Sequence, residues 1–375
     1  MFGLIGSQLL SEYLPTVPYP STEKPKPAEK QQAEDIIVSE HYPTEKLPSL
    51  NNVVVRPAYT SSLNFRTKTP DWVAEQLTFE LVNAKNGDRK GANFKTDTDV
   101  PTQFRAHNVD YWDSGWSRGH LAASASHKHS QENQDSTFLL NSNIVPQDLS
   151  MNGCDWNRLE VLVRDVTKAF PNAKVYVLSG PVWVAESQTP FTQRPFSKNK
   201  VIMHEVLGAS QVHVPTHMFK IIRVEDASKK ISASTAFLMP NRPILDEQPI
   251  ESYKTQLDSI EVQTGLDLSG MKTNTDLCTI VRCEKSSNRR MLGWRHFGRI
   301  DEARDVNELR TATRNAIDAG FVDGDNFLIA KAVRDRMLDL KISTELFPDE
   351  ERYQNAVQRG IATLTRKSVR SDDSV

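Results

Sequence analysis

Four polar residues near the middle of the chain could together break a phosphodiester bond. Arg118 and His120 lie two residues apart in the stretch GWSRGHLA, and Asn152 and Glu160 follow. A histidine with an unperturbed pKa of about 6.5 can take a proton from water at physiological pH. A metal ion would act where the leaving 3′ oxygen gathers negative charge. An asparagine oxygen is a hard, neutral ligand that suits Mg²⁺, which usually keeps several of its waters.

The spacing between Asn152 and Glu160 gives the two residues different roles. If the residues between them are all helical, their Cα atoms lie about 12 Å apart along the axis, so both side chains cannot easily bind one ion directly. We therefore predict Asn152 as the direct metal ligand and Glu160 as a residue that holds one of the ion's waters. Arg118, with its fork of donors, suits a phosphate oxygen or the charge that develops at phosphorus.

A second stretch, KSSNRRMLGWRHFGRI at residues 285–300, could bind nucleic acid. It contains several Lys and Arg residues, no acidic residue and two large aromatic side chains. Such a mixture can neutralise phosphates and stack on bases. The residues predicted to contact substrate here are Arg289, Arg290, Trp294 and Arg295. The alternative is a solvated basic loop that precedes a helix.

The remaining His and Cys candidates are weaker. His127 and His129 could mimic a metal pair, but without a nearby Cys or carboxylate ligand their spacing favours a solvated loop over a zinc site. Cys278 and Cys283 lack a second pair, which favours packing or a close thiol pair over zinc. Three cysteines are too few for a secreted disulfide framework, and the odd number points to a reducing compartment or free thiols.

The composition fits a folded protein with some unstructured length. The chain has 375 residues, of which 38% are hydrophobic and 25% charged, and this length suggests about two domains or one large domain with appendages. The 46 Lys and Arg nearly balance the 48 Asp and Glu, so any nucleic-acid surface must be local. The sequence contains no run of 18 apolar residues, so it predicts no membrane-spanning helix.

Short apolar runs predict the strands that would position these residues. From Trp72 the apolar residues mostly alternate as far as Leu81, which indicates a strand, with a helix from Thr69 as the competing interpretation. Further strands are predicted at 175–178, 201–207 and 234–238. The first of these three runs ends in a turn-like Ser-Gly-Pro at 179–181.

Helical periodicity appears in three places. Residues 155–170 place apolar side chains at spacings of three and four, which predicts an amphipathic helix that follows an Asn-Gly turn at 152–153 and ends before Pro171. Residues 301–319 and 325–340 predict two more helices, joined by a glycine-containing turn.

These patterns divide the chain into three parts. Residues 1–50 are rich in Pro and charge and predict a flexible N-terminal targeting or linker segment. Residues 51–270 contain the predicted strands and the chemical set, by which we mean Arg118, His120, Asn152 and Glu160. Residues 271–375 predict a helical extension with the basic stretch and a frayed tail.

The ordered motifs SRGH, SNIVPQ and WNRLE, together with Asn152 and the SGP tripeptide, resemble the DNA/RNA non-specific endonuclease family with a ββα-metal active site. The resemblance runs from about Arg56 to Gly270. Within that family the chain is similar to the mitochondrial exonuclease G-like branch, which has Ser where endonuclease G has Asp at position 117 and a further region after the core.

The resemblance implies an α+β fold: a central antiparallel sheet with helices and a ββα-metal finger, plus a C-terminal helical extension. It implies that His120 is the proton acceptor, Asn152 the single protein ligand of Mg²⁺, or of Mn²⁺ as the alternative ion, and Glu160 a water-mediated partner. Arg118 and Arg89 would contact phosphate.

The same resemblance implies a function, with alternatives. The expected activity is hydrolysis of DNA and RNA, with exonuclease activity in mitochondria. Endonuclease G-like behaviour is the first alternative, and a catalytically silent nucleic-acid-binding protein is the second. The joint presence of His120, Asn152 and Glu160 favours an enzyme. Relatives of this kind are usually homodimers. The resemblance also implies a mitochondrial location, with the inner membrane as one site, although the first Lys is Lys24 and the N-terminus lacks the basic presequence of many relatives.

Overall fold

The computed structural model describes residues 42–89, 92–187, 200–321 and 327–342. Most of the predicted N-terminal segment and the predicted frayed tail lie outside these residues. The end of the N-terminal segment is nevertheless part of the fold, because Tyr42 is only 3% exposed and packs edge-on against Tyr176, with 5.5 Å between ring centroids. Within the described residues, no helix is both long and apolar enough to cross a membrane.

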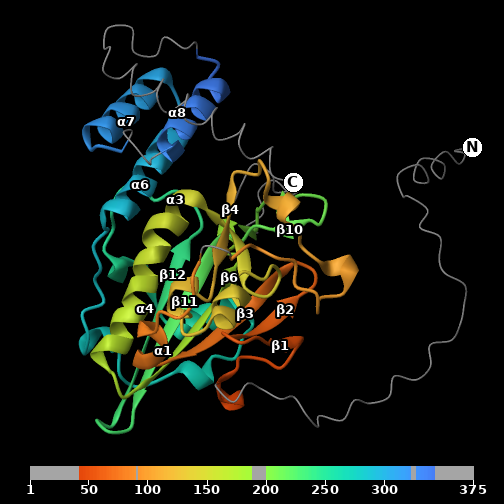
Figure 1. Ribbon diagram of the computed structural model, residues 1–375, viewed down its shortest axis with the longest axis vertical. Coiled ribbons are helices and arrows are strands. Elements are labelled where there is room, and N and C mark those ends of the chain that lie inside the picture. Colours follow the sequence, from red (N-terminus) through yellow and green to blue (C-terminus); the bar gives the residue numbers. More distant parts are fainter. Residues whose placement is uncertain (1–41, 90–91, 188–199, 322–326, 343–375) are drawn as a thin grey trace, which may run out of the picture. The chain divides into compact units, whose positions relative to one another are not determined.

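A seven-stranded antiparallel sheet forms the centre of the fold, as predicted (Figure 1). The order across the sheet is β1-β2-β3-β6-β11-β12-β13. These strands are β1 (Val53–Val55), β2 (Thr60–Asn64), β3 (Thr69–Leu77), β6 (Lys174–Val182), β11 (His217–Asp226), β12 (Ile231–Pro240) and β13 (Lys254–Thr255).

Three two-stranded ladders lie outside this sheet. They are β4 (Trp116–His120) with β5 (Ile144–Asp148), β7 (Glu186–Ser187) with β8 (Lys200–Val201), and β9 (Val206–Leu207) with β10 (Val212–His213). The predicted strand at 201–207 is therefore wrong: two short strands flank a connection in which Ile202 and Met203 are each 50% exposed, so no apolar face there is buried.

The strand predicted from Trp72 is confirmed as far as Leu77. The alternation beyond it belongs instead to helix α1 (Phe79–Asn83), because the Thr78 side chain accepts a hydrogen bond from the Leu81 amide and begins a helical turn. The turn predicted at 179–181 is also wrong, since these residues continue β6. Gly180 is needed there because an added Cβ would lie 2.6 Å from the Asp71 carbonyl oxygen and from the Phe219 ring.

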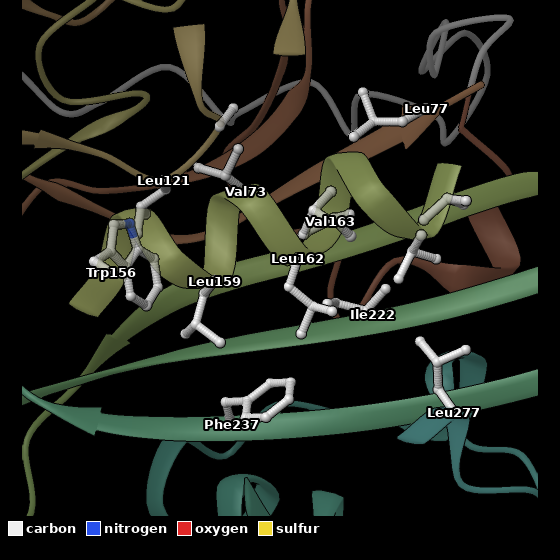
Figure 2. Close-up of a cluster of buried hydrophobic side chains, with 14 of the residues drawn as sticks. Val73, Leu77, Leu121, Trp156, Leu159, Leu162, Val163, Ile222, Phe237 and Leu277 are labelled. Carbon is white, nitrogen blue, oxygen red and sulfur yellow. The ribbon is translucent and has the colours of Figure 1, made fainter. Parts of the chain in front are cut away.

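The predicted amphipathic helix is α4 (Asn157–Ala169), and its apolar face covers one side of the sheet (Figure 2). Leu159, Leu162 and Val163 pack toward strand residues that include Ile222 and Phe237, all at most 3% exposed. The Asn-Gly turn predicted before this helix is wrong. Residues 149–156 are already helical, as α3 (Leu149–Met151) and then a π-helical turn, η5 (Asn152–Trp156).

Two of the three C-terminal helices follow the predicted pattern and one was not expected. The helices α7 (Val306–Asp318) and α8 (Phe327–Asp339) confirm the periodicity, and they share an apolar cluster with the end of α6 (Arg289–Asp301). Helix α6 occupies the stretch predicted as a basic binding segment or loop, and the Asn288 side chain caps it by accepting from the Met291 amide. The other helices are α2 (Gln131–Ser136) and α5 (Leu257–Thr264).

Contacts cross the predicted boundary at residue 270. Leu277 and Cys283 belong to the same apolar cluster as α4, and Ser234 of β12 forms a bridge with Asp276. Cys278 and Cys283 are joined in a disulfide. The sequence analysis expected either packing or a close thiol pair for these two cysteines, and the close pair is confirmed. Free thiols were also expected, and this holds only for Cys154, which is buried and forms no disulfide.

Candidate active site

The ladder of β4 and β5, followed by α3, η5 and α4, makes a β–β–α unit that carries the predicted chemical set. Alternate residues of a strand share a face, so Arg118 and His120 both project from one face of β4. Ser117 lies on the other face, paired with Gln147 of β5.

Two hydrogen bonds fasten β4 to the helical segment beside it. The Asn152 amide donates to Ser117 Oγ at 3.0 Å, and the Trp156 indole donates to the His120 carbonyl oxygen at 3.1 Å. The first and last residues of η5 are therefore each tied to β4, three residues apart on the strand. This alignment brings Asn152 and His120, which are distant in sequence, into one site.

The hydrogen-bond pattern around Ser117 fixes the orientation of Asn152. Ser117 has a single hydroxyl hydrogen, and it donates that hydrogen to the Gln147 carbonyl oxygen at 2.7 Å. Ser117 must therefore accept from Asn152, so the near atom is Nδ2. Oδ1 of Asn152 bonds to no donor among the described residues, and it is the atom that a hard cation would use.

The residues present fit a divalent cation held mainly by Asn152 and water. Oδ1 is a hard, neutral oxygen ligand that is not occupied by a hydrogen bond from a described residue. Mg²⁺ prefers such oxygen ligands and usually keeps several of its waters. Among the described residues there is no group of three or more His, Cys, Asp or Glu side chains that could hold a metal. Glu160, one helical turn beyond Trp156, would act on the ion's waters rather than on the ion.

The His120 ring packs against a pair of phenylalanine rings that also contact each other, with 5.1 Å between their centroids. Its ring centroid lies 5.5 Å from that of Phe94 and 4.7 Å from that of Phe138. Its Nε2 is buried and bonds to no residue that the structure describes. Burial, together with the cation of Arg89, lowers the pKa of His120 from 6.5 to about 3. The imidazole is therefore neutral at pH 7 and has an acceptor available.

Two guanidinium groups flank the same aromatic pair. Arg118 lies 4.4 Å from the Phe94 ring centroid and donates to Asn108 Oδ1 at 2.8 Å. Arg89, which is exposed, lies 5.8 Å from the Phe138 ring centroid. Such contacts hold the planar groups in place while leaving donors for an anion. The structure thus places both predicted phosphate-binding arginines beside His120.

Buried charges support the site on the α4 side. Burial raises the pKa of Glu160, while the cations of Arg164, Lys220 and Arg89 oppose that rise. Lys220 is only 1% exposed, donates to the Leu121 carbonyl oxygen at 3.1 Å and lies 4.7 Å from the Trp156 ring centroid. Glu160 therefore lies among charged groups, and its action on a metal-bound water stays a prediction.

The solvated-loop prediction for His127 is wrong. His127 is 2% exposed, and its Nε2 lies 2.7 Å from Oε2 of Glu75, which is 3% exposed. This histidine therefore satisfies a buried carboxylate of β3.

The predicted substrate contacts on α6 fall into two groups. Arg289 and Arg290 are exposed, and the Arg289 guanidinium lies 5.0 Å from the Phe321 ring centroid. Arg295 is 2% exposed and donates to the Ile244 carbonyl oxygen at 2.7 Å. Its predicted contact with substrate is therefore wrong, because protein partners bury and occupy its guanidinium. Trp294 is half-buried and packs on Gly153.

Sequence reasoning missed the side chains that frame the set. Phe94, Phe138 and Asn108 come from separate loops and carry no local pattern that marks them. Ser117 was noted only as a residue shared with the exonuclease G-like branch, although its position before Arg118 was a usable signal. Its function as the acceptor that orients Asn152 depends on a contact 35 residues away in sequence.

Comparison with known proteins places the chain in a family. The family model for DNA/RNA non-specific endonuclease matches residues 39–273. The mitochondrial nuclease EXOG of Xenopus laevis is 39% identical over 221 residues, which cover 58% of this chain and 59% of that relative. Human mitochondrial endonuclease G is 37% identical over 220 residues, covering 59% and 70% of the two chains. The match thus spans about three fifths of the length of the Xenopus relative.

The fold agrees with that comparison. A solved structure of the EndoG/EndoGI complex superposes with a TM-score of 0.55 at 34% identity, and covers 60% of this chain and 89% of that chain. The matched range contains β4, β5, η5 and α4, together with the residues built into the site above. The chain therefore belongs to the DNA/RNA non-specific endonuclease family.

Proposed function

We propose that this chain is a metal-dependent nuclease that hydrolyses phosphodiester bonds of both DNA and RNA. The observation that carries the proposal is the pair of hydrogen bonds from η5 to β4, which brings Asn152, whose Oδ1 has no donor among the described residues, into one site with His120, whose Nε2 bonds to no described residue. A proton acceptor and a hard metal ligand are what hydrolysis of a phosphodiester requires from the protein.

In the proposed reaction, His120 accepts a proton from the attacking water. The oxygen of that water bonds to phosphorus as the bond from phosphorus to the 3′ oxygen breaks. Arg118 and Arg89 neutralise the phosphate and hold it in line for attack. The chemistry that a divalent cation would supply at Asn152 is Lewis-acid stabilisation of the leaving oxygen. Glu160 would orient a water in that coordination sphere.

The ion that we propose is Mg²⁺, with Mn²⁺ as a substitute. Mg²⁺ prefers oxygen ligands and few direct protein contacts, which agrees with the single amide oxygen of Asn152. Arg289 and Arg290 on the exposed start of α6 are proposed to add salt-dependent contacts to the nucleic-acid backbone. Arg295 is not included in that surface because its guanidinium is buried and bonds to protein partners, and Trp294 is not included because it packs on Gly153.

We further propose mitochondrial exonuclease activity, following the relatives named for mitochondrial nucleases. A homodimeric state is proposed from the family resemblance alone. An endonuclease G-like cleavage pattern is the alternative, favoured by the human relative. A catalytically silent binding protein is disfavoured because His120, Asn152 and Glu160 are all present with their supporting contacts. Whether the protein associates with the inner membrane can be decided by fractionating mitochondria and extracting the membranes with carbonate.

One assay tests the proposed activity. Single- and double-stranded DNA and RNA, labelled at the 5′ or the 3′ end, are incubated with the protein in Mg²⁺ and then with chelator. We expect cleavage of both sugars in Mg²⁺ and none with chelator. Release of labelled mononucleotides from one end would identify an exonuclease, and internal fragments an endonuclease. Binding without cleavage in Mg²⁺ would contradict the proposal.

A further inference from the structure

Helix α6 of the C-terminal extension packs directly on the turn that carries Asn152. A Cβ added at Gly153 would lie 2.2 Å from Cγ of Trp294, and one added at Gly298 would lie 2.7 Å from Oγ of Ser150. A glycine at each of these two points lets the helices approach more closely than larger residues would allow. The extension therefore covers the residues on both sides of Asn152.

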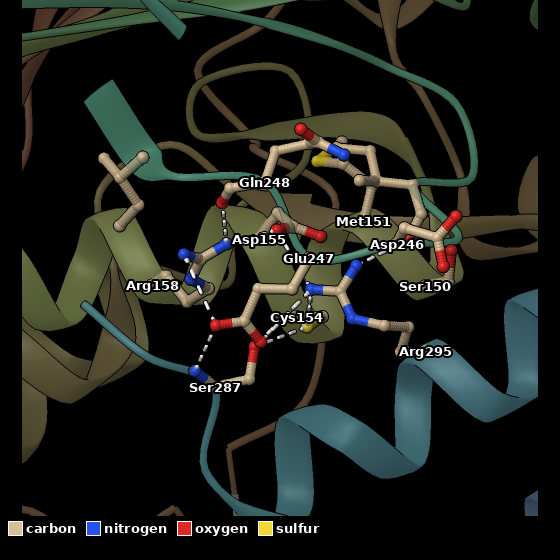
Figure 3. Close-up of polar contacts among 12 residues, drawn as sticks. Ser150, Met151, Cys154, Asp155, Arg158, Asp246, Glu247, Gln248, Ser287 and Arg295 are labelled. Atoms are coloured by element: carbon tan, nitrogen blue, oxygen red, sulfur yellow. Dashed lines mark hydrogen bonds and ion pairs between the residues drawn. The ribbon is translucent and has the colours of Figure 1, made fainter. Parts of the chain in front are cut away.

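A buried ion cluster fastens the same turn to α6 (Figure 3). The Arg295 guanidinium donates to Oδ1 of Asp155 at 3.2 Å and to Sγ of Cys154 at 3.1 Å. The same carboxylate oxygen accepts from Arg158 of α4 at 2.7 Å. Asp155 is 1% exposed, and its other oxygen bonds to no described residue. The Asp155 carboxylate therefore depends on these two arginines for its neutralisation.

The turn held in this way is π-helical, and Asn152 is its first residue. A π-helical turn contains one residue more than an α-helical turn, is rare, and persists where tertiary contacts hold it. If the turn relaxed to the α-helical register, the side chains before it would rotate by about 100° relative to those after it. Asn152 would then leave Ser117, while Trp156 stayed on the His120 carbonyl oxygen.

We propose that Trp294 and Arg295 are positioning residues that set the affinity of the site for its divalent cation, by holding η5 in the register that presents Asn152. This inference rests on the proposed function of Asn152 as the metal ligand. It assigns to the extension an action on metal binding, in addition to the substrate contacts proposed for Arg289 and Arg290.

The test uses the full-length protein and two variants of the contact, Trp294→Ala and Arg295→Met. Arg295→Lys is the conservative variant, because an ammonium keeps the charge but lacks the fork that reaches both the Ile244 carbonyl and Asp155. Arg299→Gln is the matched control on the same helix, since Arg299 bonds the exposed Asp246 at 3.2 Å. For each protein, the Mn²⁺ concentration that half-saturates the rise in Tm is measured without substrate, and the Mg²⁺ midpoint of cleavage is measured well below Tm.

We expect both metal midpoints to rise about 10- to 100-fold in Trp294→Ala and Arg295→Met, as for other residues that orient a metal ligand. The cleavage rate should recover at saturating Mg²⁺. Arg295→Lys should fall between these variants and the parent, and Arg299→Gln should match the parent. A lower Tm with unchanged metal midpoints would overturn the inference, because it would show a purely structural contact.

Two further arms keep the test decisive. If Arg295→Met does not fold, Trp294→Ala decides alone, because it leaves the ion cluster intact. Asn152→Ala separates this inference from the proposed function. If Asn152→Ala raises the metal midpoints but the α6 variants do not, only the inference about α6 is overturned. If Asn152→Ala leaves them unchanged, the proposed metal site fails as well.

Discussion

The low pKa of His120 predicts an acid-tolerant nuclease. If the pKa is about 3, about 99% of His120 is neutral at pH 5, whereas a histidine with the unperturbed value of about 6.5 would be about 3% neutral. The acidic limb of kcat/KM, which reports the free enzyme, should therefore lie well below pH 6.5. The Asn152 side chain does not titrate in this pH range, so metal binding through it adds no further pH dependence to kcat/KM.

Initial rates on a short labelled DNA well below KM, at saturating Mg²⁺ between about pH 2.5 and 8, measure this limb. Circular dichroism at each pH checks that the protein stays folded. Glu160→Gln serves as a control, because the pKa of Glu160 is raised by burial and an amide removes that titration. In Arg89→Gln, the limb should move upward, since the Arg89 cation is one of the two causes of the low pKa, yet stay below pH 6.5 because burial remains. A limb at or above pH 6.5 in the parent and in Glu160→Gln would refute the reasoning.

Three other predictions follow. Glu160→Gln should reduce metal affinity or activity by about 10- to 100-fold, because Glu160 acts on the ion through water. This loss should be smaller than that of Asn152→Ala in kinetics at graded Mg²⁺ concentrations. The reverse order would show that Glu160 is the direct ligand. Replacing Arg289 and Arg290 with Ser should flatten the log–log salt dependence of DNA binding by at most about 1.8 units, at about 0.7 to 0.9 per lost phosphate contact; an unchanged slope would remove them from the substrate surface. Leu159→Ala should lower the free energy of unfolding by about 2 to 5 kcal/mol in urea titrations, because Leu159 is 0% exposed. The exposed control Val262→Ala should have little effect, and equal losses would contradict the packing account.

Local sequence patterns predicted those elements whose buried side chains recur at a regular spacing along the chain. The apolar spacing between Asp155 and Phe170 marked α4, because its buried side chains recur every three or four residues. The antiparallel sheet and the β–β–α unit came from the ordered motifs rather than from periodicity. Within the motifs, residue type and spacing also separated the roles expected of Asn152 and Glu160.

Other features depended on partners far away in the sequence. Helix α6 resembled a basic loop because its arginines suggest exposure, yet Arg295 is buried by Asp155 and Cys154, which lie 140 and 141 residues away. The π-helical turn lies where an Asn-Gly turn was expected, and the α6 residue that bonds to it is likewise far away in the sequence. Phe94 and Phe138 frame His120 through loop positions that no repeat or spacing marks.

The most direct test of the active-site account is a Mg²⁺ titration of cleavage by the parent, His120→Ala and Asn152→Ala, each confirmed as folded by its thermal transition. We predict that His120→Ala keeps the parental Mg²⁺ midpoint but loses about 10² to 10⁴ in saturated rate, the usual contribution of a general base. Asn152→Ala should instead raise the midpoint steeply. A parental midpoint in Asn152→Ala, or a parental saturated rate in His120→Ala, would contradict the account.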